Sequence, residues 1–374
     1  MDKRRLLIIN EYFGYTSTGR IALDIAREYD EDGYEVRVAY GRKPEIPPEA
    51  EKYAYLISGK INVYLHGIYT RLTDKHGLAS RAATRRFIKW AEEFNPGLLW
   101  LHNLHGYYIN YEMLFDWIKS RPQMKVKWTL HDCWTFTGHC AHFIYIGCDK
   151  WKTQCEHCPQ LDQYPKSMRD NSYDNYQRKK KAFTGVEDLT IVTPSVWLSN
   201  MVKESFLAEY PVEVVCNTVD REAFKPACSS FKDNNGFADK KMILGVANVW
   251  NDRKGLGDFI KLDNMLDPEH YQIVLVGLDK EQIENLSQKD CHILPLSRTN
   301  NVSELVEIYN AADYFVNMTY EDTFPTVNLE AEACGTPVIT YDVGGCAETI
   351  SLEESRLVER GNVAAVAEVI KNEQ

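Results

Sequence analysis

The chain has 374 residues, which suits two domains, and its 44% hydrophobic and 26% charged residues are typical of a soluble globular protein. Its formal net charge of −11 lies in the second half, because residues 221–374 carry 14 Lys/Arg against 26 Asp/Glu. This acidic half excludes non-specific nucleic-acid binding, which needs a basic surface.

The N-terminal stretch predicts a β-α-β opening rather than a signal peptide. MDKRRLLIIN runs from charge straight into a strand over 5–10, a helix over 21–29 follows, and a second strand spans 35–40. Right-handed crossover makes the two strands parallel. The connecting loop has no GxGxxG, but Thr18 and Gly19 at the helix start can present amides to a ligand.

The segment over 71–94 predicts a basic amphipathic helix. Arg81, Arg85 and Lys89 fall at i, i+4 and i+8 and form a cationic stripe, with aromatic residues on the other side. Such a stripe is either a solvated face or a contact for anionic lipid headgroups or a phosphate-linked acceptor. No apolar run approaches the roughly 20 residues of a membrane span.

Histidines follow the next two predicted strands. The strand over 98–101 leads into HNLHGYYIN with His102 and His105, and the strand over 126–130 leads into His131. Open α/β sheets bind ligands at the carboxyl ends of their strands. We therefore expect His131 at a ligand site, with His102 and His105 one strand away.

An insertion over about 133–172 is rich in cysteine and aromatic residues. Its thiols follow the pattern C-x7-C-x6-C-x2-C, and three histidines lie among them. The closing CxxC suits a structural zinc, whereas reduced thiols in a folded loop and disulfides remain alternatives. Ten cysteines without a secretion signal favour a reducing compartment. The candidate zinc ligands are Cys140, Cys148, Cys155 and Cys158.

A second α/β domain is predicted after a boundary near residue 220. Helices over 172–183 and 194–206 and strands over 189–193 and 212–216 complete the first domain, and residues 227–239 have linker composition. Strands over 242–247, 271–276 and 291–294 and helices over 256–266 and 302–310 then repeat the rhythm. Arg253 and Lys254, in the loop after the first of these strands, suit a diphosphate.

The stretch 319–342 predicts a strand, an acidic turn, a helix over 326–334 and a strand over 338–341. Pro325 is typical of a helix start and Gly335 of a helix stop. The free amides of the first turn favour an anion, above all phosphate. Asp322 and Glu330 place two carboxylates around that site, unless this is a capped surface helix with two solvated acids.

This stretch resembles the donor site of retaining glycosyltransferases of family 4, which have the GT-B fold. An acid, seven positions, Glu330 and then ACGTPVI match the family pattern. The resemblance implies that Asp322, with Glu321 in reserve, binds hydroxyls of the donor sugar and that Glu330 binds the nucleotide ribose. The amides of the turn would hold the diphosphate: Thr323, Phe324, Thr326 and Val327.

The same resemblance covers other segments. Asn217 to Pro226 matches the end of the family's first domain, Lys254-Gly255 matches its Lys-Gly, and the DVGG turn over 342–345 matches its glycine turn. Ala247-Asn248 replaces the usual Gly-Arg, so Arg253 is expected to supply the missing guanidinium beside Asn248. His131 would face the donor sugar, and the loop with Thr18 and Gly19 the donor phosphate.

Taken together, the resemblance implies two Rossmann-like domains, 1–220 for the acceptor and 221–374 for the nucleotide-sugar, with parallel sheets facing a central cleft. It implies transfer of a hexosyl unit from a nucleotide-sugar, UDP-linked by preference, to a hydroxyl with retention, without a required cofactor. Asp30-Glu31-Asp32 has the form of a metal-binding DxD but is expected to be a solvated turn. The family's C-terminal crossing helix is expected to be short or missing.

The HDCWTFTGHC segment is similar to the colanic-acid-type branch that builds bacterial capsular or exopolysaccharide units on a saccharide or lipid-linked acceptor. This implies a cytoplasmic protein, peripheral on the inner face of the plasma membrane and in contact with anionic lipid. Two other functions remain open. One is a nucleotide-sugar 2-epimerase of the same fold, and the other is a zinc-organised binding module without catalysis.

Overall fold

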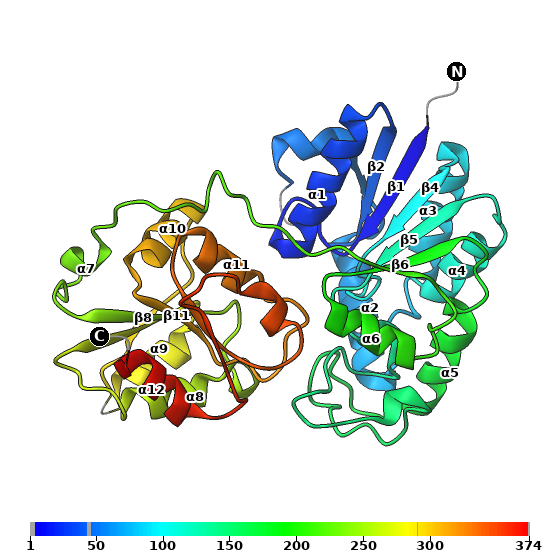
Figure 1. Ribbon diagram of the computed structural model, residues 1–374. Coiled ribbons are helices and arrows are strands. Elements are labelled where there is room, and N and C mark those ends of the chain that lie inside the picture. The colour runs from blue at the N-terminus through cyan, green and yellow to red at the C-terminus, as the bar shows by residue number, and fades with distance from the viewer. Residues whose placement is uncertain (1–3, 43–45, 290, 373–374) are drawn as a thin grey trace. The chain divides into compact units, whose positions relative to one another are not determined.

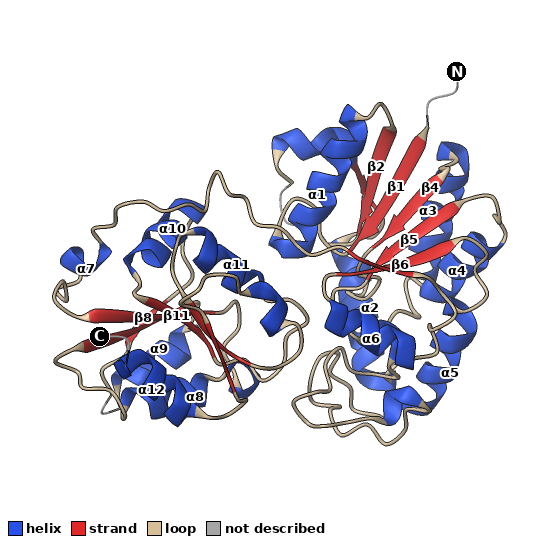
Figure 2. Cartoon of the chain, viewed as in Figure 1, coloured by secondary structure: helices blue, strands red, loops and turns tan. Residues whose placement is uncertain are grey.

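The computed structural model describes residues 4–42, 46–289 and 291–372 (Figure 1). The chain divides into two compact units, Met1–Cys216 and Asn217–Gln374, a few residues before the boundary expected near residue 220. Each unit is a parallel sheet with helices packed on it (Figure 2).

The first unit contains a seven-stranded sheet in the order β3-β2-β1-β4-β5-β6-β7, and every neighbouring pair is parallel. The order reverses between β1 and β4, which is the position where doubly wound sheets bind ligands. The strands are β1 (Arg5–Asn10), β2 (Glu35–Tyr40), β3 (Ala54–Leu56), β4 (Leu98–Leu101), β5 (Lys125–Thr129), β6 (Leu189–Thr193) and β7 (Val212–Val214).

Both faces of this sheet are buried, as continuous apolar strands predict. Leu6 and Ile8 pack on one side with α1, whereas Leu7 and Ile9 pack on the other with α3, α4 and α5. The helices of the unit are α1 (Thr16–Glu31), α2 (Lys60–Thr73), α3 (Arg81–Phe94), α4 (Tyr111–Lys119), α5 (Ser172–Phe183) and α6 (Val196–Glu204).

The second unit repeats the arrangement with a six-stranded parallel sheet in the order β10-β9-β8-β11-β12-β13. Its strands are β8 (Lys241–Val246), β9 (Tyr271–Val276), β10 (Leu294–Leu296), β11 (Tyr314–Asn317), β12 (Val338–Tyr341) and β13 (Arg356–Val358). Its helices are α7 (Phe231–Asn234), α8 (Leu256–Asp263), α9 (Lys280–Ser287), α10 (Val302–Ala311), α11 (Thr326–Ala333) and α12 (Val363–Asn372).

Three local predictions were wrong. The first helix begins at Thr16, five residues earlier than expected, and β10 spans Leu294–Leu296 instead of 291–294. The segment over 71–94 is not one helix, because α2 ends at Thr73 and α3 begins at Arg81. Asp74 and Ser80 both take left-handed backbone conformations that break a helix, and the buried Asp74 side chain contacts His139 and the Asn171 amide.

The basic stripe predicted on this segment lies on α3 as expected. Arg81, Arg85 and Lys89 are exposed, and Phe87 and Ala91 are fully buried in the core. Asp30 lies at the end of α1, where it pairs with Lys52 at 2.6 Å. Within the described ranges, no helix combines the length and the apolar character that a membrane crossing needs.

Gly255, between the short 3-10 turn Asp252–Lys254 and α8, should be the least replaceable residue of its loop. Its φ of +75° is left-handed, and a Cβ there would collide with the Met318 carbonyl oxygen. We expect Gly255→Ala to lower the free energy of unfolding by about 2–4 kcal/mol, because strain and overpacking add.

The matched control is Gly257→Ala, two residues further on, where a Cβ meets nothing within 4 Å. Inside a helix this change should stabilise by about 0.5–1 kcal/mol. Thermal melts of both variants measure the difference, and equal melting temperatures would contradict the assignment of Gly255.

Candidate functional site

In the second unit, the loops after β8 and β11 meet through an ion pair. Lys254 Nζ lies 2.6 Å from Asp322 Oδ2, and each side chain is 21% exposed. Both residues follow strands that are neighbours in the sheet, so their carboxyl ends bring the loops together. The two residues that the sequence singled out as diphosphate cation and sugar-binding acid are therefore in direct contact.

Arg253 holds the same two loops together through its backbone and its guanidinium. Its carbonyl accepts a hydrogen bond from the Tyr320 amide at 2.8 Å, and its Nη1 donates to the Glu321 carbonyl at 3.1 Å. At least one guanidinium edge thus supports the loop. The Glu321 side chain is buried, whereas Asp322 reaches Lys254, so the geometry favours Asp322 over Glu321 as the acid that faces a ligand.

The turn that follows prepares the N-terminus of α11. Asp322 Oδ1 accepts from the Phe324 amide at 3.2 Å, so that amide, predicted to bind diphosphate, is already engaged. Pro325 precedes the first helical residue, as predicted. The amides of Thr326 and Val327 have no partner among the described residues, which leaves two donors and the positive end of the helix dipole for an anion.

The DVGG turn locks this arrangement from the other side. The Gly345 amide donates to the Asp322 carbonyl at 3.1 Å, and Gly344, at φ +59°, lies so close to that carbonyl that a Cβ would collide with it. Only glycine at position 344 allows both this left-handed φ and this close approach to the carbonyl. The resemblance had marked this turn, and the structure adds its physical role.

Glu330 lies one helical turn into α11 beside the predicted packing face. Ala331 and Cys334 are buried, with Val327 packed against the same core. Glu330 Oε2 accepts a hydrogen bond from the Tyr309 hydroxyl at 3.0 Å, and the side chain is partly exposed. Tyr309 thus fixes one carboxylate oxygen, an arrangement that suits recognition of paired hydroxyls by the other.

Two further residues belong to this edge. Asn248 is exposed after β8, as predicted, and its carbonyl accepts from the Arg298 guanidinium at 2.6 Å. Thr323 is buried. Arg298 follows β10 and was not singled out from the sequence, although a cation directly after a strand is the same signal that pointed to Arg253 and Lys254.

In the first unit, the four adjacent strands β2, β1, β4 and β5 are each followed, within two residues, by a titratable residue. Glu11 follows β1 and pairs with Arg42, which follows β2, at 3.0 Å. Burial raises the pKa of Glu11, although the positive charges near it act in the opposite direction. Sequence reasoning missed this pair, yet both residues follow strand ends, as the predicted histidines do.

His131 and His102, which the sequence placed one strand apart, are in contact. His102 Nδ1 lies 3.0 Å from His131 Nε2, and the rings stack with centroids 5.3 Å apart. Burial lowers the pKa of His131 to about 4 and that of His102 well below its usual range, so both imidazoles are neutral at pH 7. His102 is buried, so of these two side chains only that of His131 is partly exposed to solvent.

His105 and Asp132 form a second pair beside the first. His105 Nε2 lies 2.9 Å from Asp132 Oδ2, and His105 Nδ1 lies 3.1 Å from the Tyr164 hydroxyl. Burial acts to lower the pKa of His105, but the Asp132 carboxylate outweighs it and the pKa is raised. Burial conversely opposes a low pKa for Asp132, and the charge of His105 holds it well below its usual range.

Thr18 and Gly19 lie at the start of a helix, as predicted, although that helix already begins at Thr16. Both lie inside the first turn of the helix, and the Gly19 amide already donates to Thr16 Oγ1 at 3.3 Å. Asn10 Nδ2 donates to the Thr18 carbonyl at 3.1 Å. Gly19 therefore has no amide to offer a ligand in this arrangement.

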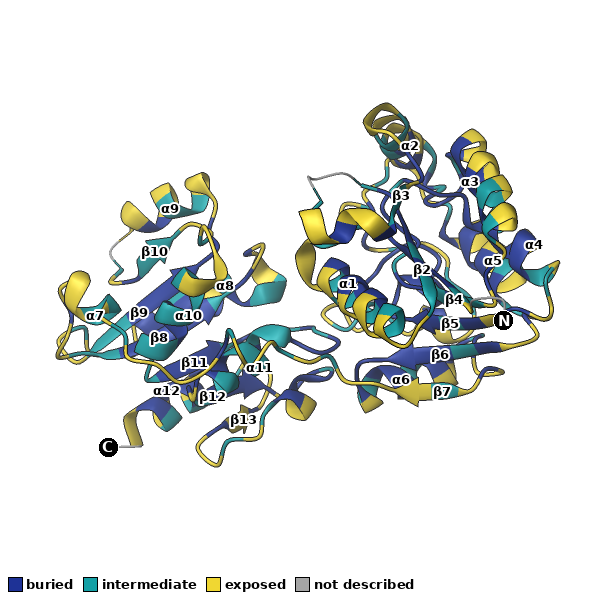
Figure 3. Cartoon of the chain, turned by 90° about the horizontal axis from the view of Figure 1, so that it is seen from above, coloured by how far each residue is buried: buried dark blue, intermediate teal, exposed yellow. Residues whose placement is uncertain are grey.

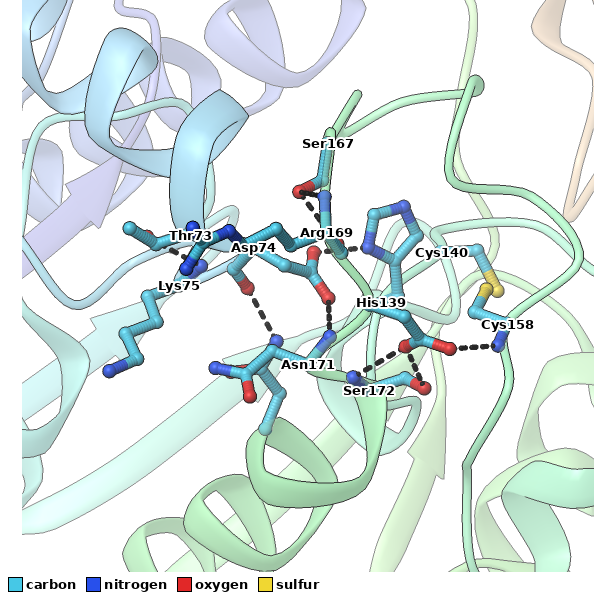
Figure 4. A network of polar contacts seen from close by, with 12 residues as sticks. Thr73, Asp74, Lys75, His139, Cys140, Cys158, Ser167, Arg169, Asn171 and Ser172 are labelled. Carbon is cyan, nitrogen blue, oxygen red and sulfur yellow. Dashed lines mark hydrogen bonds and ion pairs between the residues drawn. The ribbon is translucent and has the colours of Figure 1, made fainter.

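The cysteine-rich segment over 133–172 is irregular, but a network of polar contacts holds part of it in place (Figure 4). Asp74 pairs with His139 Nδ1 and accepts from the Asn171 amide at 2.9 Å. Asp170 accepts from the Cys158 and Ser172 amides at 2.8 and 2.9 Å. Because His139 is bound to Asp74, that ring nitrogen is not available to a metal.

The four cysteines line one small cavity as free thiols. A hydrogen bond with Cys140 lowers the pKa of Cys158 to about 7, and burial lowers the pKa of the neighbouring Lys179 ammonium to about 7. Among residues 4–42, 46–289 and 291–372, no three His, Cys, Asp or Glu side chains are arranged so that they could hold a metal ion. A zinc at these thiols stays a prediction.

Both units therefore carry charged and polar side chains just after the carboxyl ends of their parallel strands. Comparison with known families identifies the class of protein that has this architecture. Residues 18–223 match the model described as Glycosyltransferase Family 4, and residues 240–372 match the one described as Glycosyl transferases group 1. The chain belongs to glycosyltransferase family 4, and the expected GT-B fold is confirmed.

Among curated relatives, the colanic acid biosynthesis glycosyl transferase WcaC of Escherichia coli K12 is 23% identical over 344 residues, covering 87% of this chain and 78% of WcaC. An N-acetylgalactosaminyltransferase of Campylobacter jejuni, named for a diphospho-undecaprenol acceptor, is 30% identical over 126 residues, which is 32% of either chain.

Solved structures share the fold at low identity. Sucrose-phosphate synthase of Thermosynechococcus elongatus superposes with a TM-score of 0.70 at 15% identity, covering 98% of this chain and 89% of the enzyme. HepE of Anabaena in complex with UDP gives 0.64 at 15% identity, covering 98% and 88%.

The pair His105–Asp132 should be visible in a proton titration. We expect the pKa of His105 to lie above its ordinary value of 6.5 in the native protein, and to fall below 6.5 in Asp132→Asn, because burial then acts unopposed. NMR of the histidine ring protons measures both values.

The same substitution should cost about 3 kcal/mol in unfolding free energy. For His105, whose pKa is raised, the stabilisation is present below pH 6.5 and is lost as pH rises through the raised pKa; for Asp132, it is present above 3.8 and is lost as pH falls. The difference between the two proteins should therefore shrink above pH 6.5, and a constant difference would contradict the ion pair.

Proposed function

We propose that this glycosyltransferase moves a hexosyl unit from a UDP-sugar to a hydroxyl of a saccharide or lipid-linked acceptor, with retention at the anomeric carbon, in the synthesis of a bacterial surface polysaccharide. The second unit binds the donor and the first unit the acceptor. The observation that carries the proposal is the contact between Lys254 and Asp322 at the N-terminus of α11. This contact places a cation and an acid beside the amides of Thr326 and Val327, and these are the groups that the resemblance assigns to the family's donor site.

The chemistry follows from where charge develops. As the bond between the anomeric carbon and the diphosphate oxygen breaks, negative charge grows on the diphosphate, and the Lys254 ammonium and the amides of Thr326 and Val327 offset it. In the proposal, these groups of the chain carry out the role that a divalent metal has elsewhere. Asp322 accepts hydrogen bonds from sugar hydroxyls and keeps Lys254 directed at the helix end.

Retention is proposed through attack on the face from which the diphosphate leaves. The acceptor oxygen forms the new bond, and its proton passes to the departing diphosphate oxygen, so that no proton is left over. His131, neutral because its pKa is about 4, can orient a sugar hydroxyl as donor or acceptor without adding charge. Glu330, held by Tyr309, is assigned to the ribose.

The printed names of the relatives support the proposed donor and acceptor. WcaC is named for colanic acid biosynthesis, and the Campylobacter enzyme for an acceptor on diphospho-undecaprenol. HepE was solved with UDP, with UDP and glucose, and with UDP-glucose. By analogy we assign this chain a UDP-hexose donor and a place at the inner face of the plasma membrane.

Loss of the Lys254 ammonium should affect the chemical step most. We expect Lys254→Ala to lower kcat for transfer by about 10²–10³-fold, as removal of one preorganised group from a developing oxyanion does. Radiolabelled hexose incorporation from a panel of UDP-, GDP- and ADP-sugars measures it, and the anomeric proton coupling of the product reports retention or inversion.

The control is Lys261→Ala, which removes the ammonium paired with Asp258 at 2.7 Å in the same unit. That side chain is 64% exposed, so activity should stay within about twofold. Equal activity of Lys254→Ala and Lys261→Ala would refute the assignment. Incubation with a UDP-sugar and no acceptor should yield no epimer, and an epimer would establish the isomerase instead.

Glu330 should govern nucleotide affinity rather than chemistry. We expect Glu330→Ala to weaken UDP binding by about 10–100-fold, because one carboxylate that accepts two ribose hydroxyls is lost. Tyr309→Phe, which removes only the hydroxyl that orients Glu330, should give a smaller loss in the same direction. Isothermal titration calorimetry measures both, with the exposed Glu354→Ala as the control that leaves affinity unchanged.

A further inference from the structure

Helix α2 has many exposed positions (Figure 3), and several of them are large apolar residues. Ile61, Leu65, Ile68 and Leu72 recur at i, i+4, i+7 and i+11, which is the spacing of one helix face. Their exposed fractions are 78%, 57%, 40% and 51%, and Tyr64 beside them is 69% exposed. The opposite face of α2 is anchored in the protein through the buried residues His66 and Thr70. On this helix the long apolar side chains point into the solvent, whereas polar side chains are buried against the protein.

A second segment, distant in sequence, extends the same surface. The Met168 amide donates to the Arg71 carbonyl at 2.7 Å, and this places residues 166–168 against the C-terminal end of α2. Met168 is 73% exposed. Two unconnected parts of the chain thus contribute large apolar groups to one exposed face, defined here as the α2 face: Ile61, Tyr64, Leu65, Ile68, Leu72 and Met168.

A groove of about 630 Å³ runs along α2 beside this face. Its cations come from both segments: Lys60 and Arg71 on α2, and Lys166 next to Met168. None of the three pairs with an acid among the described residues, whereas Arg42, at the inner end, is paired with Glu11. The groove therefore adds uncompensated positive charge along the apolar stripe.

The local charge opposes that of the whole protein. The chain carries a net charge of −11, yet residues 54–73 contain no Asp or Glu. Any negatively charged partner is repelled by the acidic second half of the chain and attracted at this surface. A flat apolar stripe that is flanked by cations and by tyrosine, whose ring suits the interface between water and hydrocarbon, is the chemistry of a helix lying on anionic lipid.

We infer that the α2 face docks the protein on a bilayer containing anionic lipid: the apolar stripe enters the headgroup region, and Lys60, Arg71 and Lys166 bind lipid phosphates. This goes beyond the transfer reaction, since it does not depend on which donor or acceptor the enzyme uses. The sequence had left the α3 stripe open as either a solvated face or a lipid contact. Because Phe87 and Ala91 turn the apolar side of α3 into the core, we assign the lipid contact to α2 instead.

The experiment is co-sedimentation of the full chain with vesicles of phosphatidylcholine alone or mixed with phosphatidylglycerol. We expect binding to the mixed vesicles only, weakened by salt. The double variant Ile61→Ser/Leu65→Ser should lower the partition coefficient at least about tenfold, because two large side chains no longer leave water. Lys60→Glu/Arg71→Glu should lower it similarly and remove the salt dependence.

Two matched controls separate this surface from others. Tyr173→Ser changes a side chain that is 53% exposed elsewhere in the same unit, and Arg85→Ala/Lys89→Ala removes two of the three cations of the α3 stripe; both should leave most binding intact. UDP affinity and the thermal melt, measured on every variant, show that the fold and the donor site are unchanged.

The inference is overturned if the native protein ignores anionic vesicles, if the Ile61/Leu65 variant binds them as tightly as the native protein, or if only the α3 variant loses binding. A concentration-dependent dimer that Ile61→Ser/Leu65→Ser abolishes would instead assign the α2 face to a second copy of the chain. If a variant of the α2 face loses vesicle binding but still transfers to a soluble acceptor, the proposed reaction does not depend on membrane docking.

Discussion

The ion pair between Lys254 and Asp322 fixes the loops at the carboxyl ends of β8 and β11, and the candidate donor site of the second unit depends on it. It links the loops after two neighbouring parallel strands, and the backbone of Arg253, the Glu321 carbonyl and the Gly344-Gly345 turn fix those loops on both sides. The pair also has a chemical consequence. With no anion bound, Asp322 offsets the charge of Lys254, so a diphosphate gains the ammonium only by sharing it with that carboxylate.

The first unit uses the same geometry with different chemistry. Four adjacent strands of its sheet are followed, within two residues, by Arg42, Glu11, His102 and His131. The charged groups there are arranged in pairs, Arg42 with Glu11 and His105 with Asp132. Next to these pairs, His102 and His131 remain neutral, because burial lowers the pKa of each. A neutral imidazole held by a second one is suited to orienting a hydroxyl, and less suited to stabilising a carbocation by charge.

Surface chemistry separates the two units as well. The second carries most of the net negative charge, whereas the first presents the acid-free segment 54–73 with the exposed stripe of α2. An apolar surface of this kind lowers solubility and stability in water without improving the core, so its presence on a folded enzyme needs a function outside the active site. A docking role accounts for the outward Ile61 and Leu65 and also for Lys60 and Arg71, which pair with no acid among the residues that the structure describes.

The sequence by itself determined the two-domain α/β plan, most strands, the helix from Thr326 and the loops that carry Lys254, Asp322, Glu330 and His131. These features depend on local patterns, namely apolar strands, proline and glycine at helix ends, and motif spacing, which neighbouring residues decide. The tertiary structure alone decided which charges meet: Glu11 with Arg42 across 31 positions, His105 with Asp132, and Asp74 with His139. It also decided that α2 is a separate helix with its apolar side outward. Periodicity shows that a helix has an apolar face, but only the packing of the whole chain determines whether that face points into the core or into the solvent.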